Sequence, residues 1–540
     1  MIVRNYVTRV AAFFVVGAIA SGCYENFGDT IRVTPDGDTD VSGGVMAKDD
    51  SGRMHLLYGA ELNGYEYMAL RTSTDGENWD SWNMVQQLGA SEDISFRLPV
   101  ALISDTHNPD YLYAAYEWRS EGTNVVEFAR SVDGGASWTH SPQPWEPRYG
   151  AELYLSQNPH NGTIVAAWLG GEYSSIFDIT VATSVDNGVS FSEPTVAVTL
   201  ETGDGTVGCY LLGMNYAYTA SGTPRLVIAY NYNYDVRRTF YVQTIASDDD
   251  GRTWPTLYWE HVAEGGQRGS WGNRGHSDGA LGVSNGGSES LLYLAWYDYT
   301  HDDADLRYAV SRNGGETWGA AAPLGNIPYG NGDTTHQDLV AGESGTMLFL
   351  YNLGSGGYGG NLYCHEFDGI SSWSEPRRVN NHLHQGDGIY YRRGGTILSD
   401  GQRMVASWAD PRWHADGDRE LAIALSDPYL ESDVRVEMLE SSAFDEARRN
   451  EPITIDYVVE NVGDTAEAVE VWLEYVGENS GVGTLKSDQL TLDPAEEVTL
   501  SFNGRVGRNA PYQNYELIVR VGSARPDVID RDSFVAEVIP

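Results

Sequence analysis

The chain has 540 residues, and its 34 Lys and Arg stand against 77 Asp and Glu, which gives a formal net charge of −43 at neutral pH. So acidic a surface repels phosphate backbones and anionic lipid headgroups, which argues against general nucleic-acid binding and against membrane attachment through basic patches. Hydrophobic residues make up 41 % of the chain, enough for packed cores and incompatible with disorder along its whole length. The length predicts more than one domain, and the 61 Gly, 34 Tyr and 15 Trp favour an all-β chain of short strands joined by glycine turns.

The N-terminal segment has the organisation of an export signal. Arg4 and Arg9 precede an apolar stretch at residues 10–19, and Ala-Ser-Gly and then Cys23 follow. The stretch is too short to span a bilayer. The segment resembles a bacterial lipoprotein signal, which implies that Cys23 becomes the acylated first residue and holds the protein in the cell envelope. The outer membrane of a Gram-negative cell is then expected, with the protein facing outside or the periplasm; an ordinary secretory signal is the alternative.

A short turn pattern recurs along the chain, with Ser, then Asp or Asn, then Gly, then Ser or Thr, and a closing Trp or Phe. The carboxylate or amide accepts backbone N–H groups across its own turn, glycine allows a positive φ, and the aromatic ring packs beneath the hairpin. We therefore expect a folding motif without catalytic chemistry. The full copies lie at residues 131–138, 184–191, 247–254 and 311–318, and weaker ones at 73–79 and 367–373.

These copies resemble the Asp-box, or BNR, repeat of the sialidase superfamily. The resemblance covers residues 30–430 and implies a β-propeller whose outer hairpins carry the repeat. Propellers with this repeat include sialidases, other glycan-active proteins and proteins without catalysis, so the resemblance predicts the fold more sharply than the activity.

A second sequence repeat predicts the number of blades. Seven apolar strands, about 50 to 65 residues apart, each end in an aromatic residue, a spacing that suits four-stranded blades. The last unit lacks a fourth strand, and residues 30–33 are available to supply it. We predict a seven-bladed propeller closed by this N-terminal strand, with a six-bladed ring as the alternative. The seven aromatic residues are Tyr58, Tyr116, Trp168, Tyr230, Trp296, Tyr351 and Trp408.

The pattern of apolar and polar residues changes from residue 431 onward. Alternating apolar and polar residues in several segments predict an antiparallel β-sandwich over residues 431–540. This region resembles CARDB-type immunoglobulin-like modules of bacterial surface proteins in two stretches of sequence, ENVGDTAEAVEVWLEYVG and LTLDPAEEVTLSF. The predicted organisation is a signal at 1–23, a propeller at 30–430 and this module.

Cysteines and carboxylates give little sign of further chemistry. Cys209 and Cys364 fall in different predicted blades, so we expect two buried free thiols. Residues 36–40 place Asp at alternate positions, as calcium loops do, but Val41 and Ala47 occupy the positions of the glycine and glutamate of an EF-hand. We predict no cofactor and no dedicated metal site, with calcium at this loop as the open alternative.

Basic residues gather at one register of the predicted innermost strands. Arg97, His336 and Arg392 each stand seven places before the end of such a strand, and Arg274 and His276 begin another at a neighbouring position. Innermost strands surround the propeller axis. A ring of guanidinium and imidazole groups favours a carboxylate or sulfate, because guanidinium grips such groups with parallel hydrogen bonds.

The loops after the aromatic-ended strands should rim the same face. They carry Glu117 and Arg119 after one strand and Arg412 and Trp413 after another. Aromatic rings beside paired donors and acceptors suit a sugar, whose apolar face stacks while its hydroxyls form hydrogen bonds. Acidic glycans or a surface glycoprotein are the expected partners, with nucleic acid excluded, membrane contact through the N-terminal lipid only, and a monomer expected.

The sialidase resemblance extends to possible catalytic residues. Phe96-Arg97-Leu98-Pro99 is similar to the family's F/Y-R-I-P motif, which implies that Arg97 binds the sialate carboxylate. The segment from Glu117 to Arg119 is similar to the family's Glu-x-Arg segment. The family's nucleophile is a tyrosine, a role that Tyr391 would take. The chain departs from the family at residues 120–124, which contain no Asp.

Three functions follow from these residues. The first is an enzyme acting on sialylated or uronate-containing glycans, either an exo-glycosidase or a polysaccharide lyase, with Tyr391, Glu117 and His336 as candidate catalytic residues. A lyase would use a His or Tyr base to remove the proton beside a carboxylate neutralised by Arg. The second is a non-catalytic glycan-binding lipoprotein, and the third a structural or protein-binding propeller.

Overall fold

The structure is a computed structural model, and in several strands it describes the backbone without the side chains. The described residues are 31–32, 44–81, 83–90, 94–120, 123–143, 145, 153–170, 176–201, 209–219, 221–233, 240–255, 260–265, 279–284, 290–298, 305–326, 333–341, 347–354, 361–367, 373, 377–379, 390–397, 404–410, 420–425, 434–439, 446–461, 466–477, 481–506, 508, 514–524 and 527–539.

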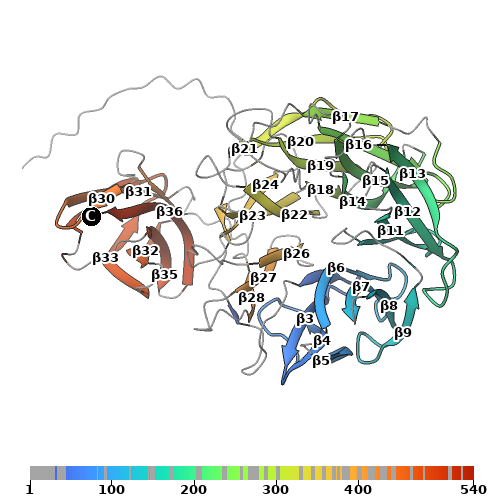
Figure 1. The fold of residues 1–540 in the computed structure, drawn as a ribbon. Coiled ribbons are helices and arrows are strands. Elements are labelled where there is room, and N and C mark those ends of the chain that lie inside the picture. The colour runs from blue at the N-terminus through green and yellow to red at the C-terminus, as the bar shows by residue number, and fades with distance from the viewer. Residues whose placement is uncertain are drawn as a thin grey trace, which may run out of the picture.

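Seven four-stranded antiparallel sheets, the blades of a β-propeller, form a ring (Figure 1). In chain order, blade 1 is β2 (Val45–Lys48), β3 (Met54–Leu62), β4 (Tyr65–Ser73) and β5 (Asn83–Ala90); blade 2 is β6 (Ile94–Ser104), β7 (Leu112–Ser120), β8 (Thr123–Ser131) and β9 (Thr139–Gln143); blade 3 is β10 (Leu153–Gln157), β11 (Ile164–Gly170), β12 (Ile176–Ser184) and β13 (Thr195–Glu201); blade 4 is β14 (Cys209–Tyr218), β15 (Pro224–Asn233), β16 (Phe240–Ser247) and β17 (Glu260–Gly265); blade 5 is β18 (Gly279–Ser284), β19 (Leu291–Asp298), β20 (Asp305–Ser311) and β21 (Ala322–Asn326); blade 6 is β22 (Asp333–Ala341), β23 (Met347–Gly354), β24 (Asn361–Phe367) and β25 (Arg377–Arg378); blade 7 is β26 (Tyr390–Ile397), β27 (Met404–Asp410), β28 (Glu420–Leu425) and the N-terminal β1 (Ile31–Arg32).

The N-terminal strand closes the ring. Ile31 and Arg32 of β1 pair with Ile423 and Ala422 of β28, so segments from both ends of the ring share blade 7. The innermost strands of successive blades contact one another, and β26 of blade 7 contacts β2 of blade 1. The seven-bladed prediction and its closing strand are therefore confirmed, and the six-bladed alternative is wrong.

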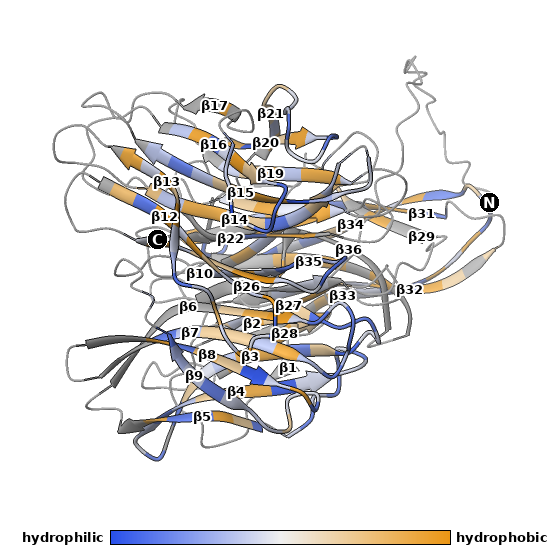
Figure 2. Ribbon diagram, turned by 90° about the vertical axis from the view of Figure 1, so that its right-hand side faces the viewer, coloured by the Kyte–Doolittle hydropathy of each residue, from blue (hydrophilic) through white to orange (hydrophobic). Residues whose placement is uncertain are grey.

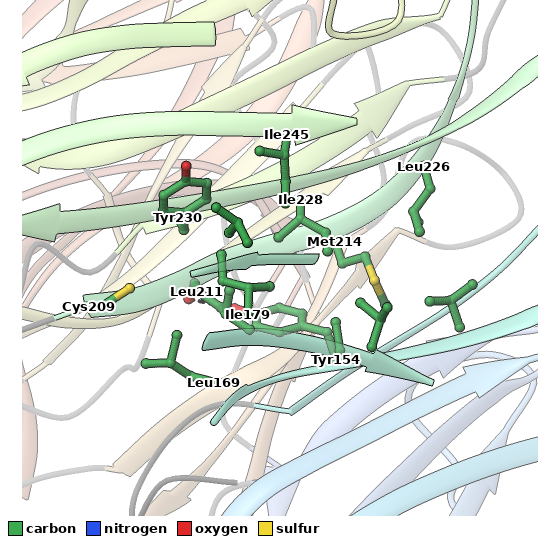
Figure 3. Close-up of a cluster of buried hydrophobic side chains, with 14 of the residues drawn as sticks. Tyr154, Leu169, Ile179, Cys209, Leu211, Met214, Leu226, Ile228, Tyr230 and Ile245 are labelled. Carbon is green, nitrogen blue, oxygen red and sulfur yellow. Dashed lines mark hydrogen bonds between the residues drawn. The ribbon is translucent and has the colours of Figure 1, made fainter. Parts of the chain in front are cut away.

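Apolar cores fill the spaces between neighbouring blades. The seven aromatic residues that mark the sequence repeat are each 2 % exposed or less. Between blades 3 and 4, Ile179, Leu211 and Ile228 belong to one such core (Figure 3). Orange, hydrophobic stretches recur along the strands in Figure 2. Cys209 and Cys364 are buried free thiols, as predicted.

The repeated turn holds itself together, as the sequence predicted. In its blade 2 copy, the Ser131 hydroxyl oxygen accepts the Gly135 N–H at 2.8 Å, and the Asp133 carboxylate accepts the Ser137 N–H at 2.8 Å. The Trp138 ring N–H donates to the Gly135 carbonyl at 3.1 Å. In this copy the Ser, Asp and Trp side chains bond within the turn, whereas Trp318 of the blade 5 copy donates its ring N–H to the Thr244 hydroxyl of blade 4 at 3.0 Å.

The end of the ring that carries these turns and the hairpins between first and second strands is called the turn face below. Side-chain hydrogen bonds join blades 1 to 5 in succession at this face, so several of its charged side chains have hydrogen-bond partners in a neighbouring blade. The bonds run from Arg53 to Asp110 at 2.9 Å, from Gln157 to Asp105 at 2.7 Å, from Asn161 to Asp250 at 2.9 Å, and from Arg225 to Glu316 at 2.9 Å.

Two further sheets follow the propeller in the sequence. One contains β29 (Val434–Met438), β31 (Pro452–Asn461) and β34 (Glu497–Arg505); the other contains β30 (Glu446–Arg448), β36 (Asp527–Ile539), β35 (Asn514–Ala524), β32 (Glu467–Gly477) and β33 (Gly481–Leu492). Residues from both sheets, including Tyr457 and Val519, form one buried cluster. The likeness to CARDB-type modules and the boundary at residue 431 stay predictions.

Two turn glycines permit a stability test. Gly135 lies in a repeated turn, and Gly222 lies in the hairpin between β14 and β15. Gly135 has φ +92°, and an added Cβ would lie 2.3 Å from a methyl group of Leu70, whereas Gly222 has φ +77° with open space around an added Cβ. Gly222→Ala should cost about 1 to 2 kcal/mol of unfolding free energy for the left-handed backbone alone. Gly135→Ala should cost about 1 to 3 kcal/mol more, because Leu70 must also move. Denaturant unfolding of both variants measures the difference, and equal losses would contradict this account.

Candidate functional site

The innermost strands all begin at the same end of the ring, called the starting face below. In blades 1 to 6 the chain enters at the innermost strand and leaves at the outermost, in blade 7 it enters at the innermost strand and leaves at the third, and the strand pairings within the blades are antiparallel. The loops between second and third strands therefore lie at the starting face as well, opposite the turn face. This places the end of β7, which carries Glu117, at the same end as the beginning of β6, which carries Arg97.

An axial cavity of about 350 Å³ runs between the innermost strands, and all seven of them contribute to its lining. Most lining residues are apolar or glycine, as with Met46 and Leu281. Polar side chains come from Asn215, Asp338 and Thr396. An apolar wall lowers the local dielectric and strengthens the interactions of charges near the cavity.

The three basic residues that share a register in the sequence lie in bulges of their innermost strands. In β6, residues 97–99 oppose Glu117 alone, because regular pairing stops at Phe96 and resumes at Val100. A β-bulge bends its strand and redirects the side chains within it. Arg97 is the first residue of this bulge.

Blades 6 and 7 repeat the arrangement. Residues 336–337 of β22 oppose Tyr351, and residues 392–394 of β26 oppose Ser407. His336 and Arg392 are thus the first residues of their bulges, as Arg97 is of its own. A bulge without a basic residue also occurs in β14, at Leu212.

The bulges of blades 6 and 7 border the axial cavity. Asp338 and Gly395 are the first residues to pair again after these bulges, and both line the cavity. Asp338 also links the two blades, because its carboxylate accepts the Gly395 N–H at 3.4 Å and the Leu339 N–H at 2.9 Å. His336 and Arg392 therefore stand at the starting-face end of the cavity. Asp338 is absent from the sequence predictions, although its place two residues after His336 in the same innermost strand was an available signal.

Buried polar residues stand opposite the bulges. Glu117 is 1 % exposed, and Tyr351 and Ser407 are 0 % exposed. The Tyr351 hydroxyl lies 3.1 Å from Nε2 of His365, which is also 0 % exposed. Burial raises the pKa of Tyr351 well above its ordinary value. These groups are buried and stand opposite the bulges in register, and a catalytic role for Glu117 stays a prediction.

The remaining predicted site residues divide into two groups. The backbone of Tyr391 pairs with Trp408 just before the Arg392 bulge, and the backbone of Arg119 pairs with Ser95 just before the Arg97 bulge. Arg274, His276, Arg412, Trp413, the lipidation candidate Cys23 and the possible calcium loop at residues 36–40 lie outside the described residues.

The described residues contain neither a cluster of metal ligands nor a membrane-spanning helix. No group of three or more His, Cys, Asp or Glu side chains in this part of the chain is arranged to hold a metal ion. No helix within the same residues is long and apolar enough to cross a membrane.

A buried polar cluster, absent from the sequence predictions, lies between blades 1 and 2. The Tyr116 hydroxyl donates to the side-chain oxygen of Gln86 and lies 3.4 Å from Nδ1 of His140. Glu127 pairs across the strands with Tyr116 and is 3 % exposed. Burial raises the pKa of Glu127 to about 7 and lowers that of His140.

Comparison with known proteins finds no matching family model and no matching curated protein. Solved structures do match. A PL25 ulvan lyase has 12 % identity and a TM-score of 0.46, covering 73 % of this chain and 95 % of its own. An α-L-arabinanase from Penicillium chrysogenum, complexed with arabinobiose, has 16 % identity and a TM-score of 0.39, covering 61 % and 93 %. A protein of unknown function from Dyadobacter fermentans has 12 % identity and a TM-score of 0.40, covering 75 % and 99 %.

Glu127 should make the stability of the propeller depend on pH. With a folded pKa of about 7 against an ordinary 4.5, the folded state keeps the proton between these values while the unfolded state loses it. Stability is therefore complete below pH 4.5 and falls as pH rises to 7, by roughly 3 kcal/mol. Glu127→Gln removes this loss, so its melting temperature should exceed that of the wild type more at pH 8 than at pH 5.

The exposed Glu193 provides the control, and Glu193→Gln should follow the wild type at both pH values. Identical pH dependence of Glu127→Gln and the wild type would show that the Glu127 carboxyl is not the titrating group.

Proposed function

We propose that the starting face binds acidic glycans at the end of the axial cavity through Arg97, His336 and Arg392. The observation that supports this most is that three basic residues, in a chain of net charge −43, each begin a bulge in an innermost strand. A fourth such bulge, in β14, has Leu212 in place of a basic residue.

The chemistry of these positions suits a carboxylate. A guanidinium binds a carboxylate or sulfate with two parallel, charge-assisted hydrogen bonds, and an imidazole adds a third donor. The surrounding acidic surface repels anions, so a local group of basic residues beside apolar walls is the favoured place for an anionic group. A uronate or sialate residue combines that charge with hydroxyls for polar neighbours such as Asn215 and Thr396.

Catalysis on such a glycan is the more specific form of the proposal. Tyr391, directly before Arg392, would act as the nucleophile of a sialidase-like hydrolase, or as the base of a lyase together with His336. In a lyase, the base removes the proton beside the carboxylate while arginine stabilises the developing negative charge. The burial of Glu117, 1 % exposed, favours binding without catalysis as the second candidate function, because an acid or base must reach its substrate.

We also propose that the protein acts at the bacterial cell envelope, attached through a lipid on Cys23. The apolar segment followed by Ala-Ser-Gly-Cys supports this. A lipid anchor would hold the propeller near glycans outside the cytoplasm while its acidic surface avoids the anionic headgroups.

Arginine substitutions test the binding site. Arg97→Ala and Arg392→Ala should each weaken the binding of oligogalacturonate by about 10- to 100-fold, since each removes a charge-assisted interaction. Arg252→Ala, in an exposed part of a repeated turn on the opposite face, should bind as the wild type does. Isothermal titration calorimetry measures the affinities. Unchanged affinity in both Arg97 and Arg392 variants would exclude the site.

Turnover separates catalysis from binding. Incubation with a fluorogenic sialoside reports hydrolysis, and ultraviolet absorbance of unsaturated products from polyuronates reports elimination. Tyr391→Phe should abolish either activity while retaining affinity, whereas a wild-type protein that binds but releases no product supports the binding function.

A Cys23→Ser variant tests the anchor. We expect it to move from the membrane fraction to the soluble fraction of the expressing bacterium and to lose incorporation of labelled fatty acid, because the acylated sulfur is gone. Wild-type protein that carries no lipid would contradict the proposal.

A further inference from the structure

Three tyrosines form a ladder on blade 4. Tyr230 and Tyr232 follow one another on the same side of β15, and Tyr241 of β16 stands opposite Tyr232 across the strands. The ring centroids of Tyr230 and Tyr232 are 6.2 Å apart, and those of Tyr232 and Tyr241 are 5.4 Å apart. Neighbouring rings in the ladder are tilted by about 30°, at 34° and 31°.

The ladder runs from the core toward the starting face. Tyr230 is 0 % exposed and belongs to the core between blades 3 and 4, where Figure 3 shows it with Cys209 at the end away from Leu226. Tyr232 and Tyr241 are only half-buried, at the end of β15 and the start of β16. Tyr232 also packs against this core, and parts of Tyr232 and Tyr241 remain at the surface.

The starting-face end of blade 4 lies only a few residues from the axial cavity, measured along β14. Tyr232 pairs with Cys209 in β14, and Leu212 of the same strand lines the cavity. Three residues of extended strand span roughly 10 Å. The two half-buried tyrosines thus lie on the face where the bulges of Arg97, His336 and Arg392 begin, and radially outward from the cavity.

The chemistry of the ladder suits a sugar next to a bound acidic one. Tyrosine rings offer apolar faces for the C–H groups of a pyranose and hydroxyls for its polar groups, and they lose little side-chain entropy on binding. A polyanionic chain that leaves the basic bulges meets an acidic surface, so neutral aromatic contacts are the ones that extend its binding without repulsion.

We propose that Tyr232 and Tyr241 form a stacking subsite for a second sugar residue of an acidic oligosaccharide whose carboxylate occupies the bulge site. This inference rests on the proposed function and adds to it that the ligand is a chain of sugars, laid outward across blade 4, and not a single acidic sugar.

The experiment compares short and long ligands. Tyr232→Ala and Tyr241→Ala should each bind oligogalacturonate hexamers about tenfold more weakly than the wild type while binding galacturonate monomers equally well, and Tyr232→Phe should retain most of the affinity because its ring remains. The matched control is Tyr218→Ala, which removes a half-buried tyrosine of the same blade from the turn face, where it packs beside His160. It should bind both ligands as the wild type does.

The outcomes separate the subsite from the proposed function. If Tyr232→Ala and Tyr241→Ala melt at lower temperatures but bind hexamers as tightly as the wild type, the ladder is structural only and the inference is overturned. The proposed function survives that result, provided that Arg97→Ala and Arg392→Ala still weaken binding. If the wild type and Arg97→Ala both fail to bind any acidic ligand, the proposed function fails and the subsite fails with it.

Discussion

The ring depends on one constraint, which is that each blade has two apolar faces and must cover both with neighbours. The cores between blades contain the aromatic residues of the second strands that mark the sequence repeat, all 2 % exposed or less. A sheet with two apolar faces leaves no blade that can stand at an end, so the row of blades must close. The pairing of β1 with β28 provides that closure without an additional sheet. Since the blades bury their sides, the two ends of the ring and its outer rim remain for recognition.

The two ends are used differently. At the turn face, polar groups are occupied within the repeated turns or between successive blades, as in the pair of Gln157 and Asp105. At the starting face, four of the described innermost strands depart from regular pairing, and in three of them a basic residue begins the departure, whereas β14 has Leu212 there. The residues that stand opposite three of these departures, Glu117, Tyr351 and Ser407, are buried. Regularity on one face and irregularity on the other is the arrangement expected when one end holds the fold and the other binds a ligand.

Charge explains why the proposed ligand is acidic although the protein is as well. A net charge of −43 keeps anions away from most of the surface. In the proposed site, basic residues at the end of an apolar cavity would attract a ligand carboxylate locally, against the general repulsion of anions by the surface. The tyrosine ladder fits the same logic, because Tyr232 and Tyr241 contribute contact area without charge. Binding by one charged contact followed by neutral stacking suits a chain of sugars.

The sequence alone determined the all-β class, the seven blades, the closing N-terminal strand and the repeated turn, because each depends on patterns within a few residues or on a regular spacing. Counting back along the predicted strands grouped Arg97, His336 and Arg392, because the innermost strands of these three blades share a similar course. Only the tertiary structure decided that these positions are bulges beside a cavity, that Asp338 links blades 6 and 7, that Glu117 is buried, and that Glu127 holds its proton up to a pH of about 7. Those properties arise from what a neighbouring strand or blade places against a residue, and residues distant in the chain supply those neighbours.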